Sequence, residues 1–205
     1  QSISLPTKRG VCSMAMAKII LLLLVLVPIR IRMAAALIDC PDVPSLGAGA
    51  ACQKACGTKL MYDLCIRMMR EGDVDMSPSH TERATAYAIL AAHSTAISFD
   101  NTTIAMSDQL SQNSSLSSKQ RVAYEGCMDD YAPADSSIDT IEEETLPSCH
   151  FTFLAAEYTR VITNVEKCRD RLLSPTLVKS PLYPMVLADL NKAVVANMLG
   201  KLLGT

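Results

Sequence analysis

Apolar and small residues recur every three or four positions in four long segments of this 205-residue chain, at about 80–110, 117–145, 150–173 and 182–203. In the second segment the repeat passes through Tyr124, Cys127, Tyr131, Ala134, Ile138, Ile141 and Thr145. In the fourth it drifts slightly, through Leu187, Leu190, Val194, Met198 and Leu202. Spacing of this kind, sustained over many steps, predicts amphipathic helices rather than strands.

Short polar or proline-containing links separate these segments. Residues 111–118 read SQNSSLSS, in which Ser117 or Ser118 can cap the following helix, and prolines interrupt the two later links. Short links between helices of similar length favour antiparallel neighbours, so we predict an all-α fold, an up-and-down four-helix bundle. Pro133 falls inside the second segment, where it should kink the helix or end it early, at a cost of about 3 kcal/mol.

The first 36 residues have the order of a secretory signal. Lys18 precedes an apolar run at Ile19–Ile29, and the small residues Ala34–Ala36 follow it. The run is shorter than the roughly 20 residues that span a membrane, although arginines behind it also fit a retained anchor. We expect cleavage after Ala36, with a secreted domain in residues 37–205 and no membrane association after cleavage.

The net charge becomes more negative when this segment is removed. Residues 1–36 hold five of the 19 basic residues and none of the 21 acidic ones, which leaves the rest of the chain at −7. An acidic protein has no electrostatic reason to bind nucleic acid. A protein partner therefore fits the charge better than a polyanion does.

Seven cysteines follow the signal: Cys40, Cys52, Cys56, Cys65, Cys127, Cys149 and Cys168. In an oxidising compartment they should form disulfides, and the odd number leaves at least one thiol free or paired between chains. Three of them, within residues 52–65, could instead bind zinc, which would require free thiols.

Cys127 and Cys168 lie on the core stripes of their predicted helices, where each can face the other. A bridge between them would close a loop of about 42 residues and stabilise the fold by about 4 kcal/mol in the chain-entropy model. The alternative is a pair of buried free thiols.

Catalytic motifs are missing from the sequence. There is no phosphate-binding loop, dinucleotide fingerprint, serine elbow or HExxH pair. His93 and Ser94 are adjacent, and neighbours on a helix point in different directions, so they cannot act as base and nucleophile. We expect no metal, no cofactor and no enzymatic activity. Glycosylation sequons at Asn101 and Asn113 are typical of a secreted protein.

Four stretches, taken in order, carry a family resemblance: ACQKACGTKLMYDLC (51–65), AYEGCMDDYAPADSSI (123–138), EYTRVITNVEKCRDRL (157–172) and the tail LADLNKAVVANMLGKLLGT (187–205). Their order and spacing resemble the plant invertase and pectin methylesterase inhibitor family. The branch that includes pollen-allergen-like invertase inhibitors is the most similar one. The resemblance covers about residues 39–205.

This resemblance implies a disulfide-stapled fold in which a short N-terminal helical hairpin, about 48–71, precedes the bundle, about 80–204. It implies that Cys52 or Cys56 bridges Cys65, with Cys52 preferred because CQKA matches the opening of the family's hairpin. It also implies a bridge between Cys127 and Cys168.

Three cysteines exceed the four that the family shares. We expect an extra disulfide between Cys40 and Cys56, which would leave Cys149 as the odd thiol.

Invertase inhibitors of the family carry a Pro-Lys-Phe element that reaches into the enzyme's active site. Its place falls at Phe151, Thr152 and Phe153, where Phe153 matches the Phe and the other two residues depart from Pro and Lys. The other interpretation is that Phe151 belongs to the core and Phe153 merely flanks it.

The resemblance implies a secreted inhibitor, in the apoplast, cell wall or vacuole, that blocks a carbohydrate-active enzyme by steric 1:1 docking. Invertase is slightly favoured as the target over pectin methylesterase. The alternative of another class is a non-inhibitory secreted bundle that binds an apolar ligand.

Overall fold

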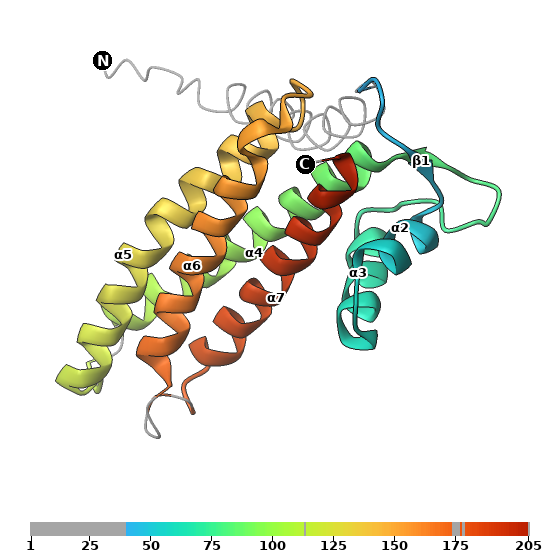
Figure 1. Ribbon diagram of the computed structural model, residues 1–205. Helices are drawn as coiled ribbons and strands as arrows, with labels where there is room; N and C mark the ends of the chain where they lie inside the picture. Colours follow the sequence, from blue (N-terminus) through green and yellow to red (C-terminus); the bar gives the residue numbers. More distant parts are fainter. Residues whose placement is uncertain (1–39, 113, 174–176, 178, 205) are drawn as a thin grey trace, which may run out of the picture. The chain divides into compact units, whose positions relative to one another are not determined.

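The computed structural model describes residues 40–112, 114–173, 177 and 179–204 (Figure 1). The predicted signal segment, with its cleavage site at Ala36, lies outside the described residues, and so does Asn113 of the second sequon. The part of the chain that the structure describes contains no helix long and apolar enough to cross a membrane.

Six α-helices dominate the described residues and confirm the predicted all-α fold. They are α2 (Ala48–Ala55), α3 (Lys59–Glu71), α4 (Ala84–Gln112), α5 (Ser118–Thr140), α6 (Leu154–Leu172) and α7 (Leu182–Gly200). A π-helical turn follows α5 at Ile141–Thr145, and 3-10 turns occupy Phe151–Phe153 and Lys201–Leu203. Two short strands, β1 (Ser45–Leu46) and β2 (Glu82–Arg83), pair antiparallel.

Helices α4 to α7 form the four-helix bundle, and each packs against the next (Figure 1). Helix α7 also packs against α4, which closes the ring. Neighbours run antiparallel: His93 near the start of α4 meets Glu142 just beyond α5, while Arg121 near the start of α5 donates to the carbonyl of Leu110 at the end of α4. The topology is therefore up-and-down.

Local sequence fixes where several helices begin. The Ser117 hydroxyl accepts from the backbone N–H of Gln120, and the Gln120 side chain accepts from the N–H of Ser117 in return. This reciprocal capping box satisfies two backbone donors at the start of α5. Thr58 caps α3 in a similar way by accepting from Met61.

The core follows the predicted stripes closely in α5 and α6. In α6, Leu154, Tyr158, Val161, Val165, Cys168 and Leu172 are all buried. In α7 the predicted stripe is wrong in part, because Leu187 is 38% exposed while Val186 and Asp189 are buried. Helix α7 is apolar around much of its circumference, so its apolar residues alone do not mark the buried face.

Pro133 was expected to kink the helix or to end it early, and it does not end the helix. Helix α5 runs through it to Thr140 and continues as the π-helical turn, in which the N–H of Leu146 donates to the carbonyl of Ile141 at 3.0 Å. Pro133 and Asp129 are both exposed. Water can therefore reach the Asp129 carbonyl, which loses its helical partner to the proline.

The hairpin of α2 and α3 is attached to the bundle at its entrance. The Arg83 guanidinium donates to the carbonyl of Val43 at 2.7 Å, and the Tyr87 hydroxyl donates to the carbonyl of Leu46 at 2.8 Å. Together with the pairing of β1 and β2, these bonds hold the chain that leads into α2 against the start of α4.

Three disulfides join six of the seven described cysteines. Cys52 pairs with Cys65 and Cys127 with Cys168, which are the two pairs that the resemblance implies. The expected pair of Cys40 and Cys56 is wrong, because Cys40 is bonded to Cys149. Contact between the entry segment and the link between α5 and α6, 109 residues apart, could not be inferred from sequence spacing.

Cys56 is therefore the free cysteine among the described residues, and not Cys149. It follows α2 directly, and its backbone N–H donates to the carbonyl of Cys52. Partial burial raises the pKa of the Cys56 thiol, which keeps the reactive thiolate scarce at neutral pH.

Candidate functional site

The residues expected to contact an enzyme form one 3-10 turn, Phe151–Phe153, which opens α6 and is called the FTF turn below. Phe153 is 71% exposed, more than any other large apolar side chain among the described residues. Thr152 is also exposed, whereas Phe151 is half-buried. The turn therefore offers one aromatic ring to a partner and holds the other partly against the protein.

An open depression of about 640 Å³ lies beside the FTF turn. Its lining combines the Phe153 ring with the acidic side chains of the π-helical turn and the imidazole of His150; the full set is Glu143, Glu144, Thr145, Pro147, Ser148, His150 and Phe153. Glu143 and Glu144 are exposed. An exposed aromatic ring next to carboxylates suits contact with a partner surface that carries an apolar pocket and basic residues.

Buried residues on both sides hold the FTF turn in place. Leu146 precedes it and Leu154 follows it, and both are almost fully buried. Between them Cys149 adopts a left-handed backbone, φ 58°, and is bonded to the buried Cys40. The turn is thus fixed by apolar anchors and a covalent link, which reduces the ordering cost that a flexible loop would incur on binding.

A histidine–carboxylate pair ties the π-helical turn to α4. His93 Nδ1 lies 2.7 Å from Glu142 Oε1, and both side chains are mostly buried. The hydrogen bond to Glu142 raises the pKa of His93, against the opposing effect of burial. Because the pair joins α4 to the residues just beyond α5, it has a positioning role at this end of the bundle.

A second, smaller hollow of about 250 Å³ lies where the C-terminal end of α3 meets α4 and α7. Apolar side chains of Met68, Leu90 and Ile97 form part of it, and Glu71 and Lys192 supply charge. It is a half-open surface notch, which differs from the enclosed apolar chamber that a carrier of apolar ligands needs.

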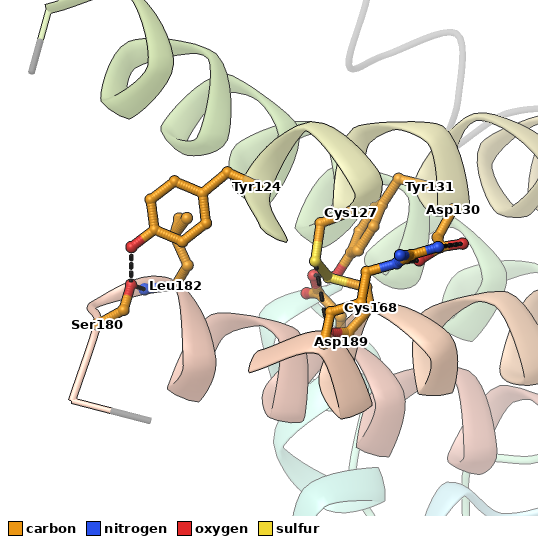
Figure 2. The surroundings of a disulfide bond; sticks show 9 residues. Tyr124, Cys127, Asp130, Tyr131, Cys168, Ser180, Leu182 and Asp189 are labelled. Carbon is orange, nitrogen blue, oxygen red and sulfur yellow. Dashed lines mark hydrogen bonds and ion pairs between the residues drawn. A yellow bond between two sulfur atoms is a disulfide. The ribbon is translucent and has the colours of Figure 1, made fainter. Parts of the chain in front are cut away.

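The bundle interior contains a buried polar cluster that the sequence analysis missed. Asp189 of α7 is 1% exposed and accepts hydrogen bonds from Ser98 of α4 and Tyr131 of α5. Figure 2 shows Tyr131 and Asp189 close to the Cys127–Cys168 bridge. The one available signal was an Asp directly before Leu190 in a helix otherwise poor in acidic residues.

Two further interactions join α5 to neighbouring segments, one to the residues just before α7 and one to α6. The Tyr124 hydroxyl and the Ser180 hydroxyl share a 2.6 Å hydrogen bond (Figure 2). Asp130 pairs with the Arg171 guanidinium of α6 at 2.6 Å. These interactions hold neighbouring segments of the bundle together, which is a structural role.

The zinc alternative for residues 52–65 does not fit the structure, since Cys52 and Cys65 are joined as a disulfide and cannot be thiolate ligands. Across residues 40–204, apart from the few left undescribed, no group of three or more metal-ligating side chains comes together. His80 pairs with Glu82 at 2.9 Å, far along the chain from His150.

Asn101 of the first sequon lies in the middle of α4, on the exposed side of the helix. The next residue, Thr102, is buried, and the Thr103 hydroxyl donates to the carbonyl of Asp100 at 3.0 Å. The side chain that would accept a glycan is thus directed away from the core.

Comparison with known proteins identifies similar folds among solved structures. A mutant form of a pectin methylesterase inhibitor from Arabidopsis matches with a TM-score of 0.62 at 15% identity, over 76% of this chain and 96% of that one. A pectin methylesterase inhibitor from Arabidopsis thaliana matches with a TM-score of 0.54 at 17% identity, over 75% and 93%. At this identity the likeness establishes the fold alone.

Sequence comparison adds no relative: no protein-family model matches the chain, and no curated protein is detectably similar to it.

Proposed function

We propose that this protein is an inhibitor that blocks a carbohydrate-active enzyme by steric docking, with pectin methylesterase as its target. The observation that carries the proposal is the fold, which covers nearly the whole length of two pectin methylesterase inhibitors.

The FTF turn is the proposed contact. Its exposed Phe153 supplies an aromatic anchor, and such anchors dominate the affinity of many protein interfaces. The neighbouring Glu143 and Glu144, together with the net charge of −7 after residue 36, favour a target whose cleft is bordered by basic residues. Inhibition would follow from covering the substrate cleft in a 1:1 complex.

Two observations support the choice of pectin methylesterase over invertase in this proposal. The two solved structures compared above are pectin methylesterase inhibitors. The FTF turn also departs from the Pro-Lys-Phe element of invertase inhibitors at Phe151 and Thr152.

We propose further that the protein acts outside the cell, in the apoplast or cell wall. The three disulfides support this, because such bonds persist in oxidising compartments. The signal-like order of residues 1–36 supports it too.

The test is inhibition by the purified full chain of a plant pectin methylesterase and a cell-wall invertase, assayed by methanol release and sucrose hydrolysis between pH 4 and 7. We expect stoichiometric inhibition of the esterase and co-elution of the pair in gel filtration. Inhibition of the invertase alone would contradict pectin methylesterase as the target. If neither enzyme is inhibited and neither co-elutes, the inhibitor function is wrong.

A further inference from the structure

Two exposed isoleucines lie on one face of α4, and the first of them, Ile97, also borders the notch toward α3 and α7. Ile97 is 47% exposed and Ile104 is 60% exposed. They are seven residues apart, close to two full turns of an α-helix, so their side chains lie one above the other on the same face. Large exposed apolar side chains arranged along one stripe favour association with another surface unless something covers them.

Asn101 lies between these two isoleucines. It is four residues after Ile97 and three before Ile104, and residues at these spacings are direct neighbours on a helix, about 5–6 Å apart between Cβ atoms. Asn101 is exposed, Thr102 is not proline, and Thr103 completes an N-glycosylation sequon. The acceptor nitrogen therefore lies within the apolar stripe itself.

We propose that Asn101 carries an N-linked glycan whose first sugars cover Ile97 and Ile104 and close this face of α4 to protein partners. The first sugar of such a glycan, N-acetylglucosamine, presents C–H groups on its ring faces and an acetyl methyl group. These groups can lie against isoleucine side chains while the hydroxyls remain in water. The occupant of the stripe is thus part of the mature protein rather than a second chain.

The modification is a group transfer from a lipid-diphosphate-linked oligosaccharide in the secretory pathway. A bond forms between Asn101 Nδ2 and C1 of the first sugar, and the bond between that C1 and the diphosphate oxygen breaks. The lipid diphosphate leaves with the electron pair, and one amide proton passes to a base of the transferase. The backbone of residues 101–103 is helical in the folded protein, so transfer must precede the formation of α4.

One consequence concerns the surface left for an enzyme. A glycan at the middle of α4 would occupy the face of that helix that carries Ile97 and Ile104, whereas the FTF turn belongs to the link between α5 and α6. The glycan proposal stands on the stripe and the sequon and does not depend on the inhibitor function.

To test this, the full chain is expressed in cultured mammalian cells behind a secretory leader. Three forms are compared: the wild type, Thr103→Ala and Thr103→Ser. Thr103→Ser keeps the sequon and the hydroxyl, whereas Thr103→Ala removes both but leaves Asn101 and the isoleucines in place. Peptide mass spectrometry before and after treatment with an N-glycosidase measures occupancy at Asn101. Retention on a hydrophobic column and light scattering measure exposure and association.

We expect most wild-type and Thr103→Ser molecules to carry the glycan. No Thr103→Ala molecule should carry it. Thr103→Ala should be retained longer and should associate at high concentration, and adding Ile97→Ser and Ile104→Ser should reverse both effects. An unmodified Asn101 in the secreted wild type would overturn the proposal. Equal retention of the two forms, or association of the glycosylated protein through this face, would also overturn it.

Discussion

The hydroxyl of Tyr131 in α5 donates a 2.6 Å hydrogen bond to Oδ2 of Asp189 in α7, across the interior of the bundle (Figure 2). The Ser98 hydroxyl of α4 donates to the other carboxylate oxygen at 2.5 Å. Burial raises the pKa of Asp189, and the hydrogen bonds from Ser98, Thr102 and Tyr131 oppose that rise. Three helices thus share one buried carboxyl group.

Replacing Tyr131 with Phe should destabilise the protein by about 1.5–3 kcal/mol, because a buried carboxyl group then loses a hydroxyl donor. The packing of the ring against Phe99, edge to face at 5.3 Å between centroids, is kept in this variant. Urea unfolding followed by circular dichroism measures the difference in free energy.

Tyr158→Phe is the matched control. Tyr158 is equally buried, but its hydroxyl has no hydrogen-bond partner among the described residues. Removing it should leave stability unchanged or raise it, since an unsatisfied buried hydroxyl is itself unfavourable. Equal losses in the two variants would show that the bond to Asp189 contributes nothing specific.

Stability should fall as the pH rises from about 4 to about 7, because Asp135 binds its proton more tightly in the folded state. Burial, with Asp100, Asp139 and Asp189 nearby, raises the pKa of Asp135 from 3.8 to about 7. Between these values the folded protein keeps a proton that the unfolded chain has released, so deprotonation favours unfolding. Asp135→Asn should therefore raise the urea midpoint at pH 8 and leave it nearly unchanged at pH 4.

Asp129→Asn serves as the control for this prediction, since Asp129 lies on the same helix and is exposed. Its urea midpoints should follow those of the wild type at both pH values. A gain at pH 8 as large as that of Asp135→Asn would point to net charge rather than to burial.

The three disulfides should differ in their contribution according to the loop that each closes. The sequence separations are 13 for Cys52–Cys65, 41 for Cys127–Cys168 and 109 for Cys40–Cys149. In the chain-entropy model these correspond to about 3, 4 and 5 kcal/mol. Double Cys→Ser variants, compared by urea unfolding, should show losses in this order, and the reverse order would mean that native-state packing outweighs chain entropy.

Phe153→Ala should leave the free energy of unfolding within about 0.5 kcal/mol of the wild type, because the ring is largely exposed. If the FTF turn contacts the enzyme, the same change should weaken inhibition at least about tenfold, as loss of an aromatic anchor does. Titration of the esterase with each variant gives the inhibition constant.

Leu173→Ala is the comparison for this experiment. Leu173 is also exposed, at 51%, but it follows the opposite end of α6. Inhibition should be unaffected by this variant. A loss equal to that of Phe153→Ala would place the contact elsewhere on the surface.

Much of the fold could be predicted because the bundle helices α5 and α6 separate buried from exposed positions cleanly. Six successive stripe positions from Tyr124 to Ile141 are buried in and just beyond α5. The predicted stripe was wrong in part in α7, where apolar residues lie around most of the helix and the sequence does not separate buried from exposed positions. There Asp189 and Leu190 are buried, whereas Leu187 is 38% exposed.

The candidate site was located only in part. The predicted third segment, about 150–173, includes Phe151–Phe153, whereas the structure places these residues in a 3-10 turn before α6. The exposure of Phe153 depends on how Leu146 and Leu154 are buried on either side. The bond between Cys40 and Cys149 depends on a contact over 109 residues, which no local pattern records. Long-range proximity of this kind comes from tertiary packing, not from spacing along the chain.

The Cys40–Cys149 bridge has a consequence for the way in which the protein would tolerate proteolysis. Its loop overlaps the loop that Cys127–Cys168 closes, so that every peptide bond from residue 40 to residue 168 lies within at least one covalent ring. A single cut anywhere in that stretch leaves the two fragments linked, and they separate only on reduction. The molecule would therefore keep its covalent integrity after a first attack by an extracellular protease.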